Sequence, residues 1–240
     1  RDLSIKGREA KGVYFAMDFL TQQNRKNNNI PLYDKEIVTT GKDVLVIGGG
    51  DTGADCVGTS LRQGAKSVTQ VEILDKPSEN RVNTNPWPQY PLILKTSTSH
   101  KEANYKYGND PREWNVTTKE FIKDENDNLT GVKIAKVESY KDGNGKINFR
   151  EIEGTEEIIK ADLVFLSIGF LHPYHEGLLN DSEVKLDGMG NVDASMIDYK
   201  TNKEKYFAAG DVRRGQSLVV WAIREGRDVS KSVHNFLKNK

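Results

Sequence analysis

The chain's best candidates for chemistry are three glycines that follow a short apolar run. The run is Val44 to Ile47, and the glycines are spaced Gly48-x-Gly50-x-x-Gly53. A diphosphate needs backbone N–H donors that no side chain obstructs, and it is favoured by the positive end of a helix dipole. Glycines at this spacing allow a tight turn, close approach of the backbone to the diphosphate and close packing of helix on strand. The spacing therefore predicts a dinucleotide-binding turn.

The residues around the glycines support this interpretation. A strand is expected over 43–48 and a helix over 51–63, which Gly64 can end. Small and apolar residues recur on one face of that helix. They are Ala54, Val57, Gly58 and Leu61. A glycine motif alone is weak evidence, and the alternative is a strand–helix turn that binds no ligand.

A second pattern lies near the C-terminus. A short apolar strand over 206–209 is expected to deliver Gly210 and Asp211, and a helix is expected to begin near Ser217. An acid before a helix N-terminus can bind a hydroxyl of a sugar alcohol, while the helix N–H groups face a carbonyl or an anion. The alternative is that Asp211 only caps a loop. The helix should bury a stripe consisting of Val219, Ala222, Ile223, Gly226, Val229 and Val233.

The elements that would position these residues follow from periodicity and turn signals. Apolar spacing predicts a helix within 13–24 and a second parallel strand over 67–74, which together with 43–63 makes half of a doubly wound sheet. Four prolines within 76–99 disfavour a long helix there. Alternating runs separated by Asp-Asn and Asp-Gly-Asn-Gly turns predict an antiparallel meander over 113–153. A buried strand is expected over 162–168, before Gly169.

Composition narrows the class of protein. The chain has 240 residues, 36% of them hydrophobic, and 35 basic residues balance 35 acidic ones, so no nucleic acid or membrane surface is indicated as a partner. No apolar run approaches the about 20 residues that span a bilayer. The single cysteine, Cys56, excludes an internal disulfide and a four-cysteine iron–sulfur cluster within the chain. It is interpreted as a packing residue in a cytoplasmic protein. The opening Arg1-Asp2, without Met, suggests a fragment.

Several stretches together resemble the glutamate synthase family. The resemblance is to the NAD(P)H-binding part of the bacterial small subunit, or to the matching C-terminal region of the single-chain eukaryotic enzymes. The sequences Asn-Pro-Trp-Pro-Gln and Arg-Arg-Gly-Gln-Ser-Leu-Val-Val-Trp are more specific than any glycine motif. The matching stretches are 48–55, 85–90, 110–112, 161–170 and 207–223.

This resemblance implies the fold and the domain boundaries. The expected class is α/β: a Rossmann-like doubly wound parallel sheet with an antiparallel β-meander, plus a C-terminal strand–helix segment of a split FAD domain. Residues 1–40 would connect from a missing part of the FAD domain, 41–168 would form the inserted NAD(P)H-binding domain, and 169–240 would return to the FAD domain. The first half of the FAD domain and a cysteine-rich region are expected to lie outside this chain.

The resemblance also implies an activity and a partner. In the family, NADPH or NADH passes a hydride to FAD, and electrons then cross iron–sulfur clusters to the large subunit, which makes glutamate from glutamine and 2-oxoglutarate. The protein's task in this segment is to position the cofactors, because they carry the chemistry. The fragment alone is expected to be inactive. No catalytic side chain and no metal ligand is expected here.

The resemblance assigns site residues as well. Gly48, Gly49, Gly50 and Gly53 would bind the diphosphate, while Asp51 and Thr52 would cap the helix and contact phosphate or ribose. The flavin would be held by the second group of residues, which consists of Gly169, Gly210, Asp211, Gln216, Ser217 and Leu218.

The choice between the two coenzymes stays open. It depends on the residues after the second strand, where an acid favours the ribose 2′-hydroxyl and a basic residue favours a 2′-phosphate. Glu72 indicates NADH if its side chain faces the ribose, whereas Lys76 and Arg81 can reach a 2′-phosphate. Many NADPH-using relatives have paired arginines where this chain has Ile73-Leu74.

Three alternatives of other kinds remain. The first is another NAD(P)H-dependent flavoprotein of the same two-domain fold, and the second is a non-catalytic nucleotide-binding module. The third is a short-chain dehydrogenase, for which Tyr199-x-x-x-Lys203 has the right spelling but lies where a turn is expected. The pair His172-x-x-His175 has metal-ligand spacing beside a proline and is interpreted as a loop.

Overall fold

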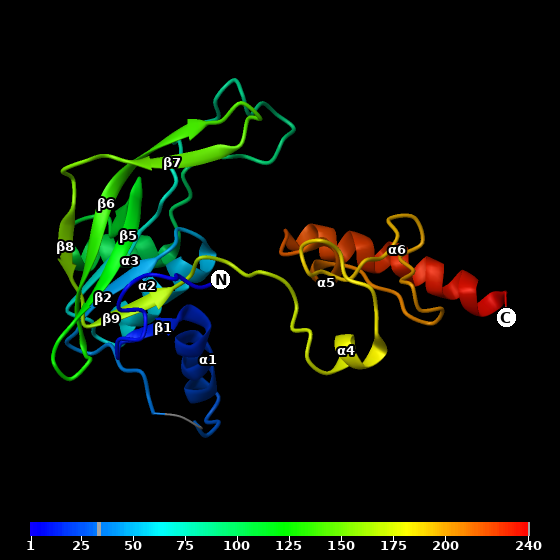
Figure 1. Ribbon diagram of the computed structural model, residues 1–240, viewed down its shortest axis with the longest axis horizontal. Coiled ribbons are helices and arrows are strands. Elements are labelled where there is room, and N and C mark those ends of the chain that lie inside the picture. The colour runs from blue at the N-terminus through cyan, green and yellow to red at the C-terminus, as the bar shows by residue number, and fades with distance from the viewer. Residues whose placement is uncertain (33–34, 240) are drawn as a thin grey trace. The chain divides into compact units, whose positions relative to one another are not determined.

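The computed structural model describes residues 1–32 and 35–239. The chain forms two compact units, one made of Asp2–Gly169 and the other of Phe170 onwards (Figure 1). The first unit contains the glycine turn, and the second contains the Gly210–Asp211 segment.

A five-stranded parallel sheet is the centre of the first unit. Its strand order is β1-β9-β2-β3-β4, and every neighbouring pair is parallel. The strands are β1 (Val13–Phe15), β2 (Asp43–Ile47), β3 (Ser67–Val71), β4 (Arg112–Glu113) and β9 (Leu163–Leu166). Because the strands are parallel, the segments that follow β2, β3 and β9 all leave from the same edge of the sheet.

The parallel sheet is the middle of three layers, because helices cover one of its faces and antiparallel strands cover the other. All five residues of β2 are buried, and successive side chains point to opposite faces. Val44 and Val46 pack against α1 (Ala16–Asn27), α2 (Asp51–Arg62) and α3 (Thr98–Tyr107). Leu45 and Ile47 pack against the antiparallel strands on the other face. The fold class is therefore α/β, as predicted, with helices over one face and a second sheet over the other.

The antiparallel layer is the predicted meander with one further strand. It consists of β5 (Val116–Lys123), β6 (Leu129–Lys141), β7 (Ile147–Glu151) and β8 (Glu157–Lys160), which also pairs with β6. Both turns form where they were predicted, and in each an aspartate accepts backbone N–H groups. In the first turn this residue is Asp124, which precedes the Asp-Asn pair that marked the turn. Asp124 accepts from Asn126 and Asn128, and Asp142 accepts from Asn144 and Lys146.

The second unit is mostly irregular. Its helices are α4 (Leu178–Ser182), α5 (Asp211–Arg214) and α6 (Val219–Lys238). A small core holds the loops together through Val184, Val192, Ala194 and Ala208.

The structure corrects several predicted elements of the first unit. Residues 13–15 form a strand beside β9, and only the residues after them are helical. The second strand ends at Val71. Three elements were missed: α3, β4 and β8. The capping box of α3 has His100 at its third helical position, where glutamate or glutamine is the usual signal. The sequence therefore lacks the pattern by which this helix start is normally recognised.

The second unit differs from prediction as well. Residues 206–209 make only an isolated bridge between Lys200 and Phe207, and Asp211 begins the short helix α5. The predicted stripe of α6 is not buried, since Val219 is 70% and Ile223 is 51% exposed. Residues 13–27, expected to belong to a connecting segment, contribute β1 and α1 to the first unit. The assignment of domains to coenzyme and flavin stays a prediction.

Candidate functional site: a glycine turn at the carboxyl edge of the parallel sheet

The glycine turn joins β2 to α2, and its first glycine has no room for a side chain. Gly48 has φ +115°, and a Cβ there would lie 2.5 Å from the Ser167 carbonyl oxygen. Gly53 lies under the turn, where a Cβ would be only 2.3 Å from the Gly48 carbonyl oxygen. These two glycines therefore let the helix pack closely on the sheet, as the motif requires.

Gly50 differs from both. No atom lies within 4 Å of the position that its Cβ would occupy. Its φ of −78° is open to any residue, so the backbone at this position does not require glycine. The start of α2 therefore faces open space, and the first N–H groups of a helix have no partner within the helix. That combination fits a bound anion.

Asp51 and Thr52 do not cap the helix as predicted. The capping position is Gly50, and no side chain caps it. Asp51 and Thr52 are instead the first two helical residues, and the exposed Asp51 carboxylate lies in the first turn. A contact of either residue with phosphate or ribose stays a prediction.

Glu72 lies over the turn. One carboxylate oxygen accepts from the backbone N–H of Gly49 at 2.5 Å, and the other accepts from the N–H of Leu74 at 3.1 Å. The half-buried side chain therefore faces the glycines rather than solvent. An acid at the end of the second strand is placed where dinucleotide folds bind the ribose.

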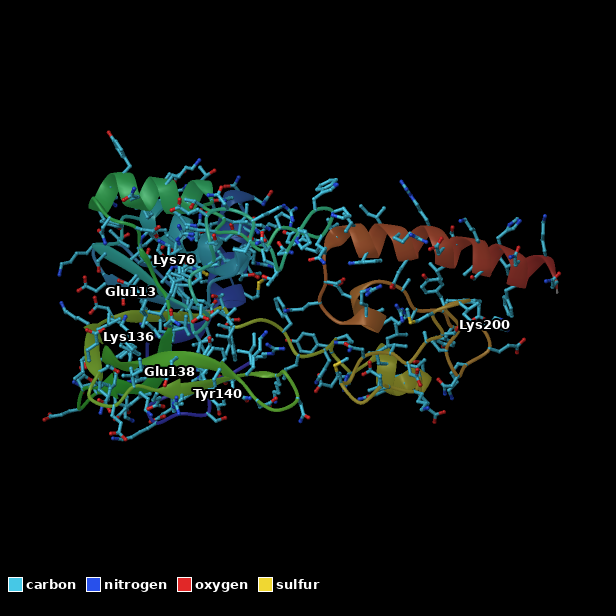
Figure 2. All side chains as sticks on the ribbon, turned by 90° about the horizontal axis from the view of Figure 1, so that it is seen from above. Lys76, Glu113, Lys136, Glu138, Tyr140 and Lys200 are labelled. Carbon is cyan, nitrogen blue, oxygen red and sulfur yellow. The ribbon has the colours of Figure 1, made fainter. Side chains whose placement is uncertain are left out.

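The two basic candidates differ in their surroundings. Arg81 donates to the carbonyl oxygens of Asn85 (3.1 Å) and Gln89 (2.9 Å), and its guanidinium lies 6.0 Å from the Trp87 ring centre. It thus holds the proline-rich loop together. Lys76 is exposed. Figure 2 labels Lys76 on the same unit as Glu113 and Lys136, which form an ion pair at 3.2 Å.

Sequence reasoning missed the residues that support the turn from below. Gln70 on β3 is 1% exposed, and its Nε2 donates to the Gly48 carbonyl oxygen at 2.8 Å. His100 on α3 is 5% exposed and lies 2.8 Å from Gln70 Oε1. Burial and, secondarily, Arg112 lower the pKa of His100, while Asp110 acts against them. A polar residue within a short strand is the only signal that marks Gln70.

In the second unit a buried acid holds the Gly210 turn. Glu225 on α6 is 2% exposed and accepts from the Gly210 backbone N–H at 2.8 Å. Arg213 and Arg214 pair with the same carboxylate at 2.5 and 3.0 Å. The hydrogen bond from Arg213 is the main cause that lowers the pKa of Glu225 to about 2. Sequence reasoning missed Glu225, because it interrupts the apolar residues of α6.

The remaining flavin candidates lie near this turn. Asp211 accepts from the Ser217 hydroxyl at 3.0 Å. Gln216 Oε1 accepts from the backbone N–H of Phe170 at 3.0 Å, the residue after Gly169, whose φ is +83°. Leu218 is the N-terminal cap of α6. Gln216 and Ser217 thus lie in the segment between α5 and α6, and a contact of any of these candidates with a flavin stays a prediction.

The cysteine, the Tyr-x-x-x-Lys match and the histidine pair singled out in the sequence lie in surroundings that explain them structurally. Cys56 is fully buried, and burial raises the pKa of its thiol to about 12. Tyr199 has φ +59° and is outside any helix, which contradicts a short-chain dehydrogenase site. His172 and His175 stack with ring centres 4.2 Å apart, and no metal-binding group of three or more ligands occurs among residues 1–32 and 35–239. None of the described helices combines the length and apolarity needed to cross a bilayer.

Comparison with known proteins finds relatives that match nearly the whole chain. Residues 112–226 match the family described as pyridine nucleotide-disulphide oxidoreductase. The glutamate synthase (NADPH) small chain of Bacillus subtilis is 45% identical over 239 residues, which cover 99% of this chain and 48% of that protein. The glutamate synthase (NADH) of Schizosaccharomyces pombe is 43% identical over 234 residues, covering 97% of this chain and 11% of that protein. The predicted relationship to glutamate synthase small chains is confirmed.

Solved structures support the fold. FprA of Mycobacterium tuberculosis in complex with NADPH aligns with a TM-score of 0.64 and 15% identity, covering 100% of this chain and 61% of that one. At this identity the likeness concerns the fold alone. The chain spans about half the length of the Bacillus relative.

Proposed function

We propose that this chain, a homologue of glutamate synthase small chains, forms the NAD(P)H-binding part of such a subunit and belongs to its electron-input flavoprotein. The subunit oxidises NADPH or NADH and passes the electrons through FAD, and through iron–sulfur clusters outside this chain, to a large subunit. There glutamine and 2-oxoglutarate yield glutamate. The cellular setting of this reaction is the cytoplasm.

The open glycine turn is the observation that carries the proposal. The N-terminus of α2 and the open space at the Gly50 Cβ position fit a diphosphate, because no side chain caps the helix and its first N–H groups have no partner within it. The Gly49 N–H, in contrast, already donates to Glu72. Gly48 and Gly53 keep helix and strand close enough to maintain that space. Glu72 extends over the turn and is suited to receive the ribose of the coenzyme.

The second unit supplies one part of the flavin site. FAD, when bound, accepts the hydride from the nicotinamide. Asp211 is placed to bind a hydroxyl of the ribityl chain, with Ser217 orienting its carboxylate. The N-terminus of α6, which begins after Leu218, would present its N–H groups to the pyrimidine edge of the flavin and would stabilise the negative charge of the reduced ring.

Coenzyme titration tests the first half of this proposal. We expect the chain to bind NADH or NADPH with one-to-one stoichiometry, measured by calorimetry and by the fluorescence of the reduced nicotinamide. Failure of both coenzymes to bind would overturn it. The flavin step is tested in the full-length protein, where anaerobic NADPH or NADH should bleach the visible absorbance of bound FAD.

A further inference from the structure

A buried chain of hydrogen bonds runs from the glycine turn to the cap of α3. The Gly48 carbonyl oxygen accepts from Gln70 Nε2 at 2.8 Å, and Gln70 Oε1 lies 2.8 Å from His100 Nε2. The other imidazole nitrogen, His100 Nδ1, lies 3.2 Å from the backbone nitrogen of Ser97 and 3.1 Å from the Ser97 hydroxyl oxygen. Gln70 and His100 are both at least nine-tenths buried, so water does not satisfy their polar atoms.

These partners determine which imidazole nitrogen carries a proton. The Gly48 oxygen can only accept, so the Gln70 amide nitrogen faces it and the Gln70 oxygen faces His100. That oxygen also can only accept, so His100 Nε2 must donate. His100 Nδ1 is then unprotonated and accepts from the Ser97 N–H, which completes the cap of α3. The neutral imidazole satisfies these partners. A doubly protonated ring still donates from Nε2 to Gln70 but places its new N–H against the Ser97 N–H, so protonation acts on the cap of α3 that holds the ring.

An arginine holds the end of this hydrogen-bond chain that lies at the cap of α3. Arg112 has a side chain that is 4% exposed and pairs with Asp110 at 2.7 Å. It also donates to the Lys95 carbonyl oxygen at 2.8 Å and to the Thr96 hydroxyl at 3.1 Å. These are the two residues before Ser97, so the cap of α3 is held from both sides.

The other end of the hydrogen-bond chain, at Gly48, lies under the glycine turn. A Cβ on Gly53 would be 2.3 Å from the Gly48 oxygen, 2.5 Å from Gln70 Nε2 and 2.9 Å from Ser167 Oγ. The Ser167 hydroxyl also lies 3.2 Å from the Gly48 oxygen. The third glycine of the motif thus leaves room for two side chains that hold the first glycine in place.

We propose that Gln70 is a positioning residue for the dinucleotide turn and that the Nε2–H of His100 sets its orientation. Protonation of Nδ1 disturbs the cap of α3 that holds the ring against Gln70, and so weakens coenzyme binding. This inference rests on the proposed function. Gln70 acts through the backbone of Gly48 and does not contact the coenzyme. A displaced Gly48 moves the N–H groups of the following turn away from the diphosphate.

The charged groups around His100 give the direction of the pH effect. Arg112 on β4 and Asp110 just before it face the ring, and its other partners, Gln70 and Ser97, are neutral. Burial and Arg112 lower the pKa of His100 below its ordinary value of 6.5. Coenzyme binding should therefore be strong at neutral pH and should weaken as the pH falls through the lowered pKa of His100, which lies below 6.5.

A matched pair of variants separates positioning from stability. Gln70→Leu removes both hydrogen bonds, and Gln22→Leu removes a comparable buried pair that Gln22 makes with the backbone of Ile37, away from the turn. Both variants should melt at lower temperature. Only Gln70→Leu should weaken coenzyme binding, by about three- to tenfold, the equivalent of a lost buried hydrogen bond. Unchanged affinity in Gln70→Leu, or equal losses in both variants, would overturn the inference.

A pH profile tests the part played by His100. The ratio of coenzyme affinity between the natural chain and His100→Gln is measured from about pH 8 to about pH 5, the range in which histidine titrates. Because a ratio is used, the ionisation of the coenzyme cancels. The ratio should fall with falling pH, and a constant ratio would contradict the inference. Gly50→Val separates failure of this inference from failure of the proposed function. If neither Gly50→Val nor Gln70→Leu weakens coenzyme binding, the proposed site is wrong. If Gly50→Val abolishes binding and Gln70→Leu leaves it unchanged, only the positioning role of Gln70 is wrong.

Discussion

Gly50 is the residue at which the coenzyme site can be blocked without disturbing the fold. Its φ of −78° is available to valine, and its Cβ position is open. Gly50→Val should therefore fold normally and should abolish NAD(P)H binding, because the added methyl groups occupy the space that the diphosphate must enter. Calorimetric titration measures the binding, and circular dichroism checks the fold.

Gly143 offers a control for this substitution. It also has open space at its Cβ position and lies in the remote turn between β6 and β7. Gly143→Val should leave coenzyme affinity unchanged. A folded Gly50→Val protein with normal affinity would mean that the diphosphate binds elsewhere.

Glu72 is the residue that should distinguish the two coenzymes. Its carboxylate faces the glycine turn, so in the proposed site it would favour a ribose 2′-hydroxyl and repel a 2′-phosphate. Glu72→Ala should shift the ratio of NADH to NADPH affinity towards NADPH by about tenfold, since hydrogen bonds to charged groups contribute roughly 1.5–3 kcal/mol. Parallel titrations with the two coenzymes measure the ratio. An unchanged ratio would exclude a ribose contact of Glu72.

At the scale of elements, α6 and the turn at its start depend on Glu225. Removing the charge of this buried acid leaves Arg213 and Arg214 without their partner, which costs roughly 3 kcal/mol for a buried pair. Glu225→Gln should therefore loosen the turn around Gly210. Hydrogen–deuterium exchange of residues 207–215, read by mass spectrometry, should become at least about tenfold faster.

The same acid predicts a pH dependence of that segment. The pKa of Glu225 is lowered from its ordinary 4.5 to about 2. Its stabilising effect is therefore complete above pH 4.5 and is lost as the pH falls towards 2.

Asp228→Asn is the control for the exchange measurement on Glu225→Gln, because Asp228 forms exposed helix pairs with Arg224 and Lys231 that contribute little. Equal exchange in both variants would contradict the role of Glu225.

At the scale of the whole molecule, the exposed face of α6 is the most informative feature. Val219 is 70% and Val220 is 59% exposed at the end of the helix where the flavin is expected. Apolar surface of this kind usually marks an interface. The Bacillus relative is about twice as long as the region that this chain matches, so further residues are available in that protein to cover it.

We therefore expect residues 1–240 expressed alone to bind no FAD and to show no NAD(P)H oxidation. In the proposed function the Asp211 segment would provide only one wall of the flavin site, and no second diphosphate-binding turn is present in this sequence. A visible spectrum of the purified chain measures this directly. A yellow protein with stoichiometric flavin would show that the site is complete within these residues.

The sequence alone determined the features that rest on local chemistry. The apolar run and glycines predicted β2, the turn and α2, because backbone freedom and helix periodicity are local properties. The aspartate turns predicted the antiparallel meander, since each aspartate accepts N–H groups from residues close in sequence. The motifs predicted the relationship to glutamate synthase that the comparisons confirm.

Only the tertiary structure decided which distant residues support these features. Gln70 meets His100 across 30 positions, and Glu225 meets Gly210 across 15. Such contacts depend on strand order and helix packing, which periodicity does not specify. The direction of Glu72 was likewise undetermined in sequence, because an acid after a strand can point to either face. Burial decided these cases: an enclosed polar atom must find a partner, and the fold determines which one lies within reach.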